Sequence, residues 1–309
     1  MESLSVIIPV HGSIEPVLPL LDSLVGPEVD PADRPARVLV VDDATPQPLD
    51  GSALPEGVEL IRRENNGGFG AAVNTGLHAC GTPWALVLNS DLQIGPGLAR
   101  ALLEDAQPFA PAVVGCRIQD EAGVSGYAGR YFPTISQQVV EWLVPLASQR
   151  HRDVLHRAVG HDLDAERGSG MVPVDWVSGA IMLLPVQEVL AIGGFDEGFF
   201  MYTEEVDLQK RLRERGVPAY LDADRLVLHE GGGSSGGEGR RRRWLVGARM
   251  RYARKHSNVH LLRAGMTAAT AANLLWNTGR RLAGRDVHPV EDCREQLSLI
   301  WTAGKDLPR

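Results

Sequence analysis

The chain has 309 residues, enough for one large core, and its 44% hydrophobic and 23% charged content is ordinary for a globular protein. The formal net charge of −8 argues against general binding to nucleic acid. The 3 cysteines are far apart, and neither a signal peptide nor an apolar run of membrane-spanning length is evident. We therefore expect a cytoplasmic protein with reduced thiols.

The first half of the chain alternates short apolar runs with helical patterns. Unbroken apolar runs are typical of strands buried on both faces of a parallel sheet. Their alternation with helices predicts right-handed βαβ units and an α/β fold with a mostly parallel sheet. The expected strands span residues 4–10, 37–41, 58–61, 84–88 and 112–118, and the expected helices span 14–25, 71–79 and 98–106.

Polar residues follow two of these strands at the point where each ends. Asn89, Ser90 and Asp91 come after the run 84–88, and Asp42 and Asp43 close the run 37–41. Ligands of open α/β sheets bind just beyond the carboxyl ends of the strands. Carboxylates gathered there suit a cation, a ribose hydroxyl or a base N–H. Turn formation and helix capping are the alternatives for the same residues.

The second half of the chain holds another group of acidic residues. A strand within 175–184 and a turn over 193–197 are expected to precede Glu204, Glu205 and Asp207. Thr203 is a suitable N-cap for a helix that stops at Gly216. Because the helix dipole favours acids in the first turn, helix stabilisation alone is the alternative to a functional role.

His229 follows two short predicted strands, 219–222 and 226–228, and precedes a run rich in Gly and Ser. Such a histidine is usually structural, but next to a flexible run it is also a candidate ligand beside a lid.

Farther upstream, an apolar patch within 139–146 is expected to pack in the core rather than to stay exposed.

The C-terminal region reverses the overall charge. The block 240–243 consists of arginines, and Trp244 and Tyr252 follow at helical spacing. A solvated helix face is one interpretation, and a helix lying on an anionic membrane is the other. The apolar run 264–276 is too short to span a bilayer, so it either extends such a surface or packs on the domain.

Taken together, these motifs resemble the family-2 inverting glycosyltransferases of the GT-A fold, and most of all their bacterial rhamnosyltransferase-like branch, which builds cell-surface glycans. The resemblance covers residues 4–256 and rests on the order of its motifs rather than on any single one. The motifs are SVIIPV (5–10), VVDDAT (40–45), NNGGFGAAVN (65–74), LNSD (88–91), GGFDE (193–197), YTEEVD (202–207) and HEGG (229–232).

The resemblance implies a role for particular residues. Asp91 and His229 would hold Mg²⁺ or Mn²⁺, and Glu205 would be the catalytic base, with Glu204 and Asp207 as alternatives. Asn89 and Glu205 both stand where the family usually has aspartate. Residues implied at the acceptor are Trp176, Ser178, Gly179 and Ala180. Residues implied at the nucleotide-sugar are Pro9, Val10, His11, Asp42, Asp43, Asn66, Gly68, Asn74, Asn89, Ser90 and Asp91.

The resemblance also implies a function and a domain layout. We expect a metal-dependent hexosyltransferase that moves a sugar from dTDP-rhamnose or a UDP-sugar to a glycan or a polyprenyl-linked saccharide. Residues 1–237 would form the GT-A domain, with a nucleotide half (1–118) and an acceptor half (119–237). Residues 238–309 would form a helical extension that touches the inner face of the membrane, and an oligomer is compatible with the sequence.

Two other functions share some of these features. A sugar nucleotidylyltransferase would need a Gly-rich loop with Lys or Arg after the first strand, but residues 10–14 contain neither. An inactive, glycan-binding scaffold at the membrane is the second alternative, suggested by Asn89 and Glu205. Nucleotide-sugar hydrolysis in the presence of metal distinguishes an active transferase from such a scaffold.

Overall fold

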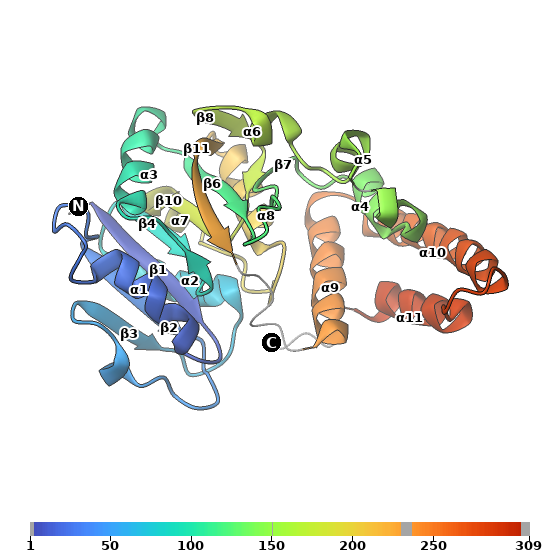
Figure 1. Ribbon diagram of the computed structural model, residues 1–309, viewed down its shortest axis with the longest axis horizontal. Coiled ribbons are helices and arrows are strands. Elements are labelled where there is room, and N and C mark those ends of the chain that lie inside the picture. The colour runs from blue at the N-terminus through green and yellow to red at the C-terminus, as the bar shows by residue number, and fades with distance from the viewer. Residues whose placement is uncertain (1–2, 150, 230–236, 304–309) are drawn as a thin grey trace.

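The computed structural model describes residues 3–149, 151–229 and 237–303 (Figure 1). A twisted sheet carries helices on its faces, and the C-terminal helices project to the right of it in the figure. The main sheet has nine strands: β3 (Val58–Arg62), β2 (Arg37–Asp42), β1 (Leu4–Val10), β4 (Trp84–Leu88), β10 (Ile181–Pro185), β6 (Val113–Gln119), β11 (Ala219–His229) and β5 (Leu92–Gln93) in spatial order, with β8 (Met171–Val174) on β11. A small second sheet pairs β7 (Gly129–Arg130) with β9 (Trp176–Val177).

The helices agree with most of the sequence-based expectations. The α-helices are α1 (Leu18–Val25), α2 (Phe69–Cys80), α3 (Leu98–Ala106), α4 (Ile135–Trp142), α5 (Asp153–Ala158), α6 (Leu163–Arg167), α7 (Val186–Ala191), α8 (Glu204–Glu214), α9 (Glu238–His256), α10 (Val259–Leu282) and α11 (Pro289–Thr302). Short 3-10 helices cover Glu15–Val17, Gly51–Ala53, Gln107–Phe109 and Val144–Gln149. The expected helix 14–25 is therefore split into a 3-10 turn and α1.

The strand directions bring several carboxyl ends to one edge of the sheet. β3, β2, β1 and β4 are parallel to their neighbours, whereas β10 is antiparallel to both β4 and β6. Because β11 is parallel to β6, it ends at the same edge as β1, β2 and β4. The α/β class and the mostly parallel sheet are confirmed. The expectation of two short strands over 219–228 was wrong, since β11 is one strand with a bulge between Asp222 and Leu226.

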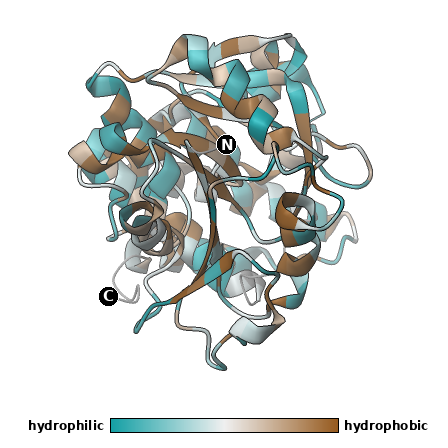
Figure 2. Ribbon diagram, turned by 90° about the vertical axis from the view of Figure 1, so that its left-hand side faces the viewer, coloured by the Kyte–Doolittle hydropathy of each residue, from teal (hydrophilic) through white to brown (hydrophobic). Residues whose placement is uncertain are grey.

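The main core surrounds the central strands. Ile7, Leu39 and Leu86 have no exposed surface, as expected of strands that are buried on both faces. Figure 2 shows these strands mainly in brown, whereas the surface helices and loops mix teal and brown. The apolar runs identified in the sequence thus form the interior of the sheet.

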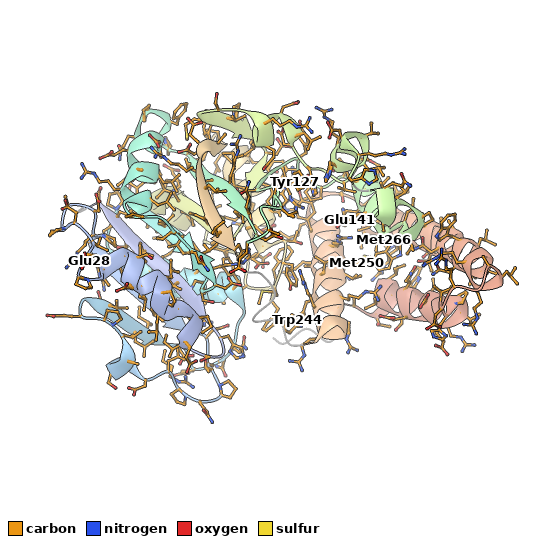
Figure 3. All side chains as sticks on the ribbon, viewed as in Figure 1. Glu28, Tyr127, Glu141, Trp244, Met250 and Met266 are labelled. Carbon is orange, nitrogen blue, oxygen red and sulfur yellow. The ribbon has the colours of Figure 1, made fainter. Side chains whose placement is uncertain are left out.

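A second hydrophobic cluster joins α4 to the C-terminal helices. Met250 of α9 and Met266 of α10 are fully buried in it, and they lie in the space between α9 and the α10–α11 pair (Figure 3). Val139 and Trp142 of α4 pack against this cluster. Val139 and Trp142 of the apolar patch within 139–146 therefore pack as expected, although their partners come from the C-terminal end of the chain.

The interpretation of α9 as a membrane-surface helix does not fit Tyr252. Tyr252 is only 2% exposed and belongs to a third cluster with Phe199. The Trp244 ring packs against Phe200 at 4.9 Å between ring centroids. These side chains attach α9 to the core. Within the described residues, no helix is both long and apolar enough to cross a membrane.

Gly76 tests how closely α2 approaches the sheet. A Cβ atom at Gly76 would lie 2.5 Å from Ile7 Cγ2 of β1, whereas one at the helical Gly279 would meet no described atom within 4 Å. We expect Gly76→Ala to lower the free energy of unfolding by about 1–3 kcal/mol through overpacking. Gly279→Ala should raise it by roughly 0.5–1 kcal/mol through helix propensity. Urea unfolding measures both, and equal stabilisation by the two alanines would contradict the close approach.

Candidate functional site

The loops after β1, β2 and β3 meet at the carboxylate of Asp43. Its Oδ1 accepts hydrogen bonds from Arg63 Nε (2.8 Å) and the Gly67 amide (3.1 Å), and its Oδ2 accepts one from the Gly68 amide (2.7 Å). His11 lies above it, with Nδ1 3.0 Å from the Asp43 carbonyl oxygen and close to the Asn66 amide. Asp43 thus fixes the Gly-rich turn that begins α2.

Asp42 differs from its neighbour because its side chain has no exposed surface. It accepts hydrogen bonds from the amides of Thr45 (2.8 Å) and Leu49 (3.4 Å) and forms an ion pair with Arg62. Burial opposes its charge, but these partners outweigh burial and hold the pKa of Asp42 below its usual value. Asp42 therefore shapes the loop after β2 from beneath.

Pro9 and Val10 end β1 beside this loop, and Val10 is only 3% exposed. Gly68 is required by two features of its position. Its φ of +83° lies in the left-handed region, and a Cβ atom there would sit 1.7 Å from the Phe200 carbonyl oxygen. The turn before α2 is thus in direct contact with the loop before α8.

Asn74 holds the same loop from another side. Its Oδ1 accepts a hydrogen bond from the Phe195 amide (2.8 Å), and its Nδ2 donates to the Phe195 carbonyl and to Glu197, both at 3.0 Å. Asn74 is 8% exposed. Its amide is therefore used within the protein, and it shapes the site through the position of the loop.

Asp91 and His229 come together although 138 positions separate them. β5 pairs with the last residues of β11, which places Asp91 Oδ1 3.0 Å from His229 Nε2. Burial opposes the charge of Asp91, but the hydrogen bond and charge of His229 keep its pKa below the usual value. Asn89 and Ser90 precede Asp91 at this edge, and the Asn89 amide donates to the Ala180 carbonyl at 2.9 Å.

This pair fits a divalent cation. Two cis ligands of an octahedral ion, each about 2.1 Å from it, are separated by about 3.0 Å. Oxygen and imidazole donors suit Mn²⁺ as well as Mg²⁺. Within the described ranges, no three His, Cys, Asp or Glu side chains gather as a metal-binding group, so this part of the chain offers two ligands here. Residues 230–236, which contain the rest of the HEGG motif and most of the run rich in Gly and Ser, lie outside the described residues.

The residues expected at the acceptor lie on β9 and in the turn to β10. Trp176 is 8% exposed, and its Nε1 donates a hydrogen bond to the Tyr131 carbonyl oxygen at 2.9 Å. The Arg130 Cζ atom lies 5.6 Å from the centroid of the Trp176 ring. Ser178 Oγ accepts a hydrogen bond from the Ala180 amide at 3.3 Å. A Cβ atom at Gly179 would lie 3.4 Å from Glu205 Cγ, so this turn borders the acidic start of α8.

The start of α8 is irregular. Thr203 occupies the N-cap position, but its φ is +70°, and within this helix its side chain caps no backbone amide. The expectation that Thr203 acts as a side-chain cap was therefore wrong. Tyr202 also has a positive φ, of +71°. Two consecutive left-handed residues turn the chain sharply, and the loop that contacts Gly68 enters α8 through this turn.

The three carboxylates of this turn have different environments. Glu204 is 3% exposed, and its Oε2 has no hydrogen-bond partner in the described part of the chain. Burial and the neighbouring Glu205 raise the pKa of Glu204 well above its usual value. Burial also raises the pKa of Glu205, although backbone hydrogen bonds and the charge of Arg130 oppose the shift. Glu205 is the partly exposed member of this pair.

Asp207 is fully enclosed by basic side chains. It receives Arg211 Nε at 2.8 Å, Lys255 Nζ at 2.6 Å and His256 Nε2 at 2.7 Å. Burial opposes its charge, but these partners hold the pKa of Asp207 below its usual value. Asp207 is therefore an ion-paired link between α8 and α9.

Asp196 forms a second link from the same loop to α9. Its carboxylate contacts Arg251 Nη2 at 2.7 Å and Lys255 Nζ at 2.6 Å. No role in the site was predicted for Arg130, Arg251, Lys255 or His256. The spacing of Asp207 and Arg211, four residues apart on one helix, was the one detectable signal of this network.

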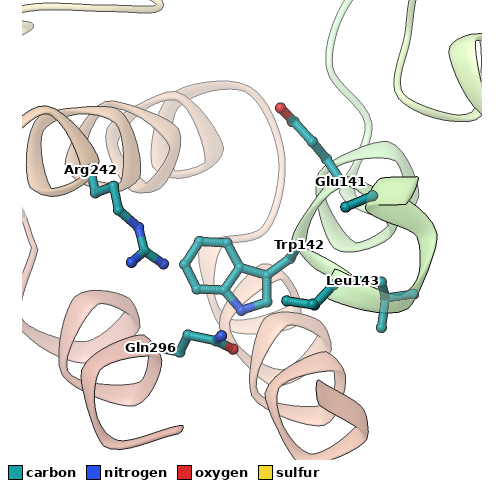
Figure 4. A pocket seen from close by; sticks show the side chains of 7 residues that line it. Glu141, Trp142, Leu143, Arg242 and Gln296 are labelled. Carbon is teal, nitrogen blue, oxygen red and sulfur yellow. The ribbon is translucent and has the colours of Figure 1, made fainter. Parts of the chain in front are cut away.

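A pocket of about 190 Å³ lies elsewhere, between α4, α9 and α11 (Figure 4). None of its lining residues is a predicted site residue. Two charged side chains that line it are paired, Glu141 with Arg249 and Arg242 with Glu295. The candidate site is therefore the sheet edge with the start of α8.

The Asp196 ion pairs predict an acid-sensitive contact. Burial raises its pKa, but Lys255 and Arg251 outweigh burial and lower it from 3.8 to about 2. Asp196 therefore stabilises the fold above pH 3.8, and that contribution disappears as the pH falls towards 2. We expect Asp196→Asn to cost about 1–2 kcal/mol of unfolding free energy at pH 7 and to flatten its decline between pH 4 and 2.

Urea unfolding over this pH range measures the Asp196→Asn effect. The control is Asp286→Asn, because the Asp286 side chain is 93% exposed. An equal loss of stability in the two variants, or an unchanged pH slope in Asp196→Asn, would show that the ion pairs to α9 contribute little.

Solved structures with similar folds are glycosyltransferases. The mannosyltransferase from Pyrobaculum calidifontis, in complex with GDP-Man and Mn²⁺, aligns with a TM-score of 0.57 and 16% identity over 98% of this chain and 87% of its own. GalNAc-T7 with UDP, GalNAc and Mn²⁺ aligns with a TM-score of 0.54 and 13% identity over 82% of this chain and 48% of its own. These likenesses establish the GT-A fold.

Sequence relatives lead to the family. N-acetylglucosaminyl-diphospho-decaprenol L-rhamnosyltransferase of Mycobacterium tuberculosis is 29% identical over 66% of this chain and 69% of its own length. Rhamnosyltransferase WbbL of Escherichia coli is 30% identical, over 33% of this chain and 34% of its own. The sequence profile of glycosyl transferase family 2 matches residues 5–159, which is half of the chain. The chain therefore belongs to glycosyl transferase family 2 and is a glycosyltransferase similar to its rhamnosyltransferases.

Proposed function

We propose that the chain is a metal-dependent, inverting hexosyltransferase. Its donor is a nucleotide-diphosphate-sugar, dTDP-rhamnose or a UDP-sugar, and its acceptor is a hydroxyl of a polyprenyl-linked saccharide. The observation that carries this proposal is the Asp91–His229 pair at the end of β11. The neighbouring Asn89 is hydrogen-bonded to Ala180, and Gly179 of that turn borders Glu205. The names of the sequence relatives support rhamnose as the sugar and a lipid diphosphate as the carrier.

The donor binds across the ends of β1, β2 and β4. Asp43, His11 and Asn66 form the nucleoside side, where Asp43 fixes the Gly67–Gly68 turn by accepting hydrogen bonds from both backbone amides. Asp91 and His229 would hold a divalent cation. When bound, it would neutralise charge on the departing diphosphate.

Glu205 is the base. Burial raises its pKa, which makes it a better proton acceptor than an ordinary carboxylate, and the charge of Arg130 opposes that shift. The acceptor hydroxyl oxygen bonds to the anomeric carbon from the face opposite the leaving group. The bond from that carbon to the diphosphate oxygen breaks with its electron pair, and the hydroxyl proton passes to Glu205.

Neither neighbouring carboxylate suits the role of the base as well as Glu205 does. Glu204 is buried, and burial and the charge of Glu205 raise its pKa well above the usual value. Asp207 is occupied by Arg211, Lys255 and His256. Gly179 borders Glu205, so Trp176, Ser178 and Ala180 of the same segment form the acceptor side.

The proposed acceptor also gives the chain a location. A polyprenyl-linked saccharide is anchored in a bilayer, so the enzyme works at the inner face of the cell membrane. We propose residues 1–237 as the transferase domain and residues 238–309 as a helical extension. A thermal-shift panel of nucleotide-sugars with and without Mn²⁺ tests the donor class, because a true donor stabilises the fold by mass action.

Asp91→Ala should abolish the metal-dependent part of donor binding. Losing a charged ligand removes at least about 1.5–3 kcal/mol of interaction, which raises the dissociation constant roughly tenfold to hundredfold. Calorimetric titration of the nucleotide-sugar, with Mn²⁺ and with EDTA, measures it. Asp120→Ala, a change in an exposed turn, is the control. An unchanged Mn²⁺-dependent affinity would remove Asp91 from the cation site.

Glu205→Gln should leave donor affinity nearly normal and lower turnover by roughly 10²–10⁴-fold, the range for a lost general base. Glu204→Gln is the matched control, because Glu204 is buried next to Glu205 and glutamine keeps its size while removing its charge. Its turnover should stay within about tenfold of the wild type. Single-turnover transfer with saturating donor measures both. A dead Glu204→Gln beside an active Glu205→Gln would reverse the assignment and leave the transferase function intact.

A further inference from the structure

The outer face of α10 is apolar and uncovered. Leu261, Leu275 and Leu282 are 57%, 76% and 85% exposed, and Ala264, Ala268 and Ala271 lie exposed between them. These positions recur every three or four residues, so they share one side of the helix. The opposite side, which includes Met266 and Asn273, is buried. A helix that is apolar on both sides is expected to be covered on both.

The exposed apolar side chains are concentrated in this part of the molecule. Within the described residues, eleven large hydrophobic side chains are exposed, and six of them lie on α10 and α11. Besides the three leucines they are Trp276, Val290 and Trp301. In Figure 1 the α10–α11 turn is the end of the molecule farthest from the sheet. Exposed apolar side chains concentrated on two neighbouring helices indicate an interaction site rather than a random exposure.

The charges of α10 identify the partner. This helix contains Arg263, Arg280 and Arg281 and no Asp or Glu, and the turn after it adds Arg285 and Asp286. Of the acids of α11, Asp292 accepts a hydrogen bond from the buried Asn277 and Glu295 pairs with Arg242 of α9, whereas Glu291 is 80% exposed near His288. Arginines nevertheless outnumber acids along α10 and the turn after it, in a chain with a net charge of −8.

A second copy of the chain is a poor occupant for this face. Two α10 helices packed on each other would bring only positive charges together, without the opposite charges that flank the seams of paired helices. An anionic bilayer complements both properties, because arginines bind its headgroups while leucines and tryptophan enter the boundary with the acyl chains.

We propose that the outer face of α10, with the basic turn at its end, docks on an anionic lipid surface. The inference rests on the proposed function, because a lipid-linked acceptor requires the enzyme at a bilayer. The proposed membrane contact is therefore α10 rather than α9. The helix lies along the surface over about 30 Å, the length of its exposed series, and does not cross the bilayer.

Sedimentation of the full chain with phosphatidylcholine vesicles, with or without phosphatidylglycerol, tests this surface. We expect binding only to the anionic vesicles, and weaker binding as salt rises. The double variant Leu275→Asp/Leu282→Asp should bind at least about tenfold more weakly. Both sites are exposed, so thermal unfolding should be unchanged. Equal binding to neutral vesicles, or none to either, would overturn the proposal.

Arg240→Glu/Arg241→Glu on α9 is the matched control. It changes the net charge by −4, whereas the leucine variant changes it by −2, so a general charge effect would weaken the α9 variant more. We expect the α9 variant to lose less than about threefold. A larger loss in the α9 variant than in the leucine variant would return the membrane contact to α9. Light scattering that shows a dimer broken by the leucine substitutions would assign the face to a second copy instead.

Quenching by brominated phosphatidylglycerol gives an independent readout. Trp276 is 48% exposed beside Leu275, so its fluorescence should be quenched, and Trp276→Phe should remove most of the lipid-dependent quenching. Donor binding is measured separately, without vesicles. A chain that binds anionic vesicles but no nucleotide-sugar would end the proposed function and leave the docking surface standing, and the reverse result would do the opposite.

Discussion

The loop from Phe195 to Thr203 is the constraint on which both halves of the site depend. The Asn74 amide holds it at one end, and Gly68 admits its Phe200 carbonyl so closely that any side chain would collide. Asp196 ties it to α9 through Arg251 and Lys255. The loop then turns through two left-handed residues into α8. Its position therefore sets the distance between the donor turn and Glu205, so the proposed chemistry depends on contacts outside the reacting groups.

Much of the fold could be predicted because it depends on local signals. Unbroken apolar runs such as Trp84–Leu88 need two buried faces, which a parallel sheet supplies. The antiparallel β10 and the bulge in β11 escaped prediction, because they depend on which distant strand lies beside them. The prediction for Thr203 was wrong for a related reason. Its residue type suits a cap, but it follows another left-handed residue at a φ of +70°, and its side chain caps no amide of α8.

The residues of the candidate site show the same difference between local signals and contacts with distant parts of the chain. Asp43 and Asp91 could be located because strand ends are visible in the sequence, and parallel strands end at a common edge. His229 could be proposed only through the motif that it begins, since 138 positions separate it from Asp91. Lys255 and His256 could not be found, because a basic helix face looks the same whether it meets solvent or a buried carboxylate such as Asp207.

The ion pairs between α9 and the rest of the chain bear on how the protein is made. A ribosome releases the strands, Glu205 and Asp207 long before residues 251–256, and domains generally begin to fold from the N-terminal side during synthesis. Until α9 emerges, Asp207 lacks Lys255 and His256, and Phe199 lacks the cover of Tyr252. The nascent sheet can thus form early, whereas the turn that carries the proposed base is completed only near the end of translation.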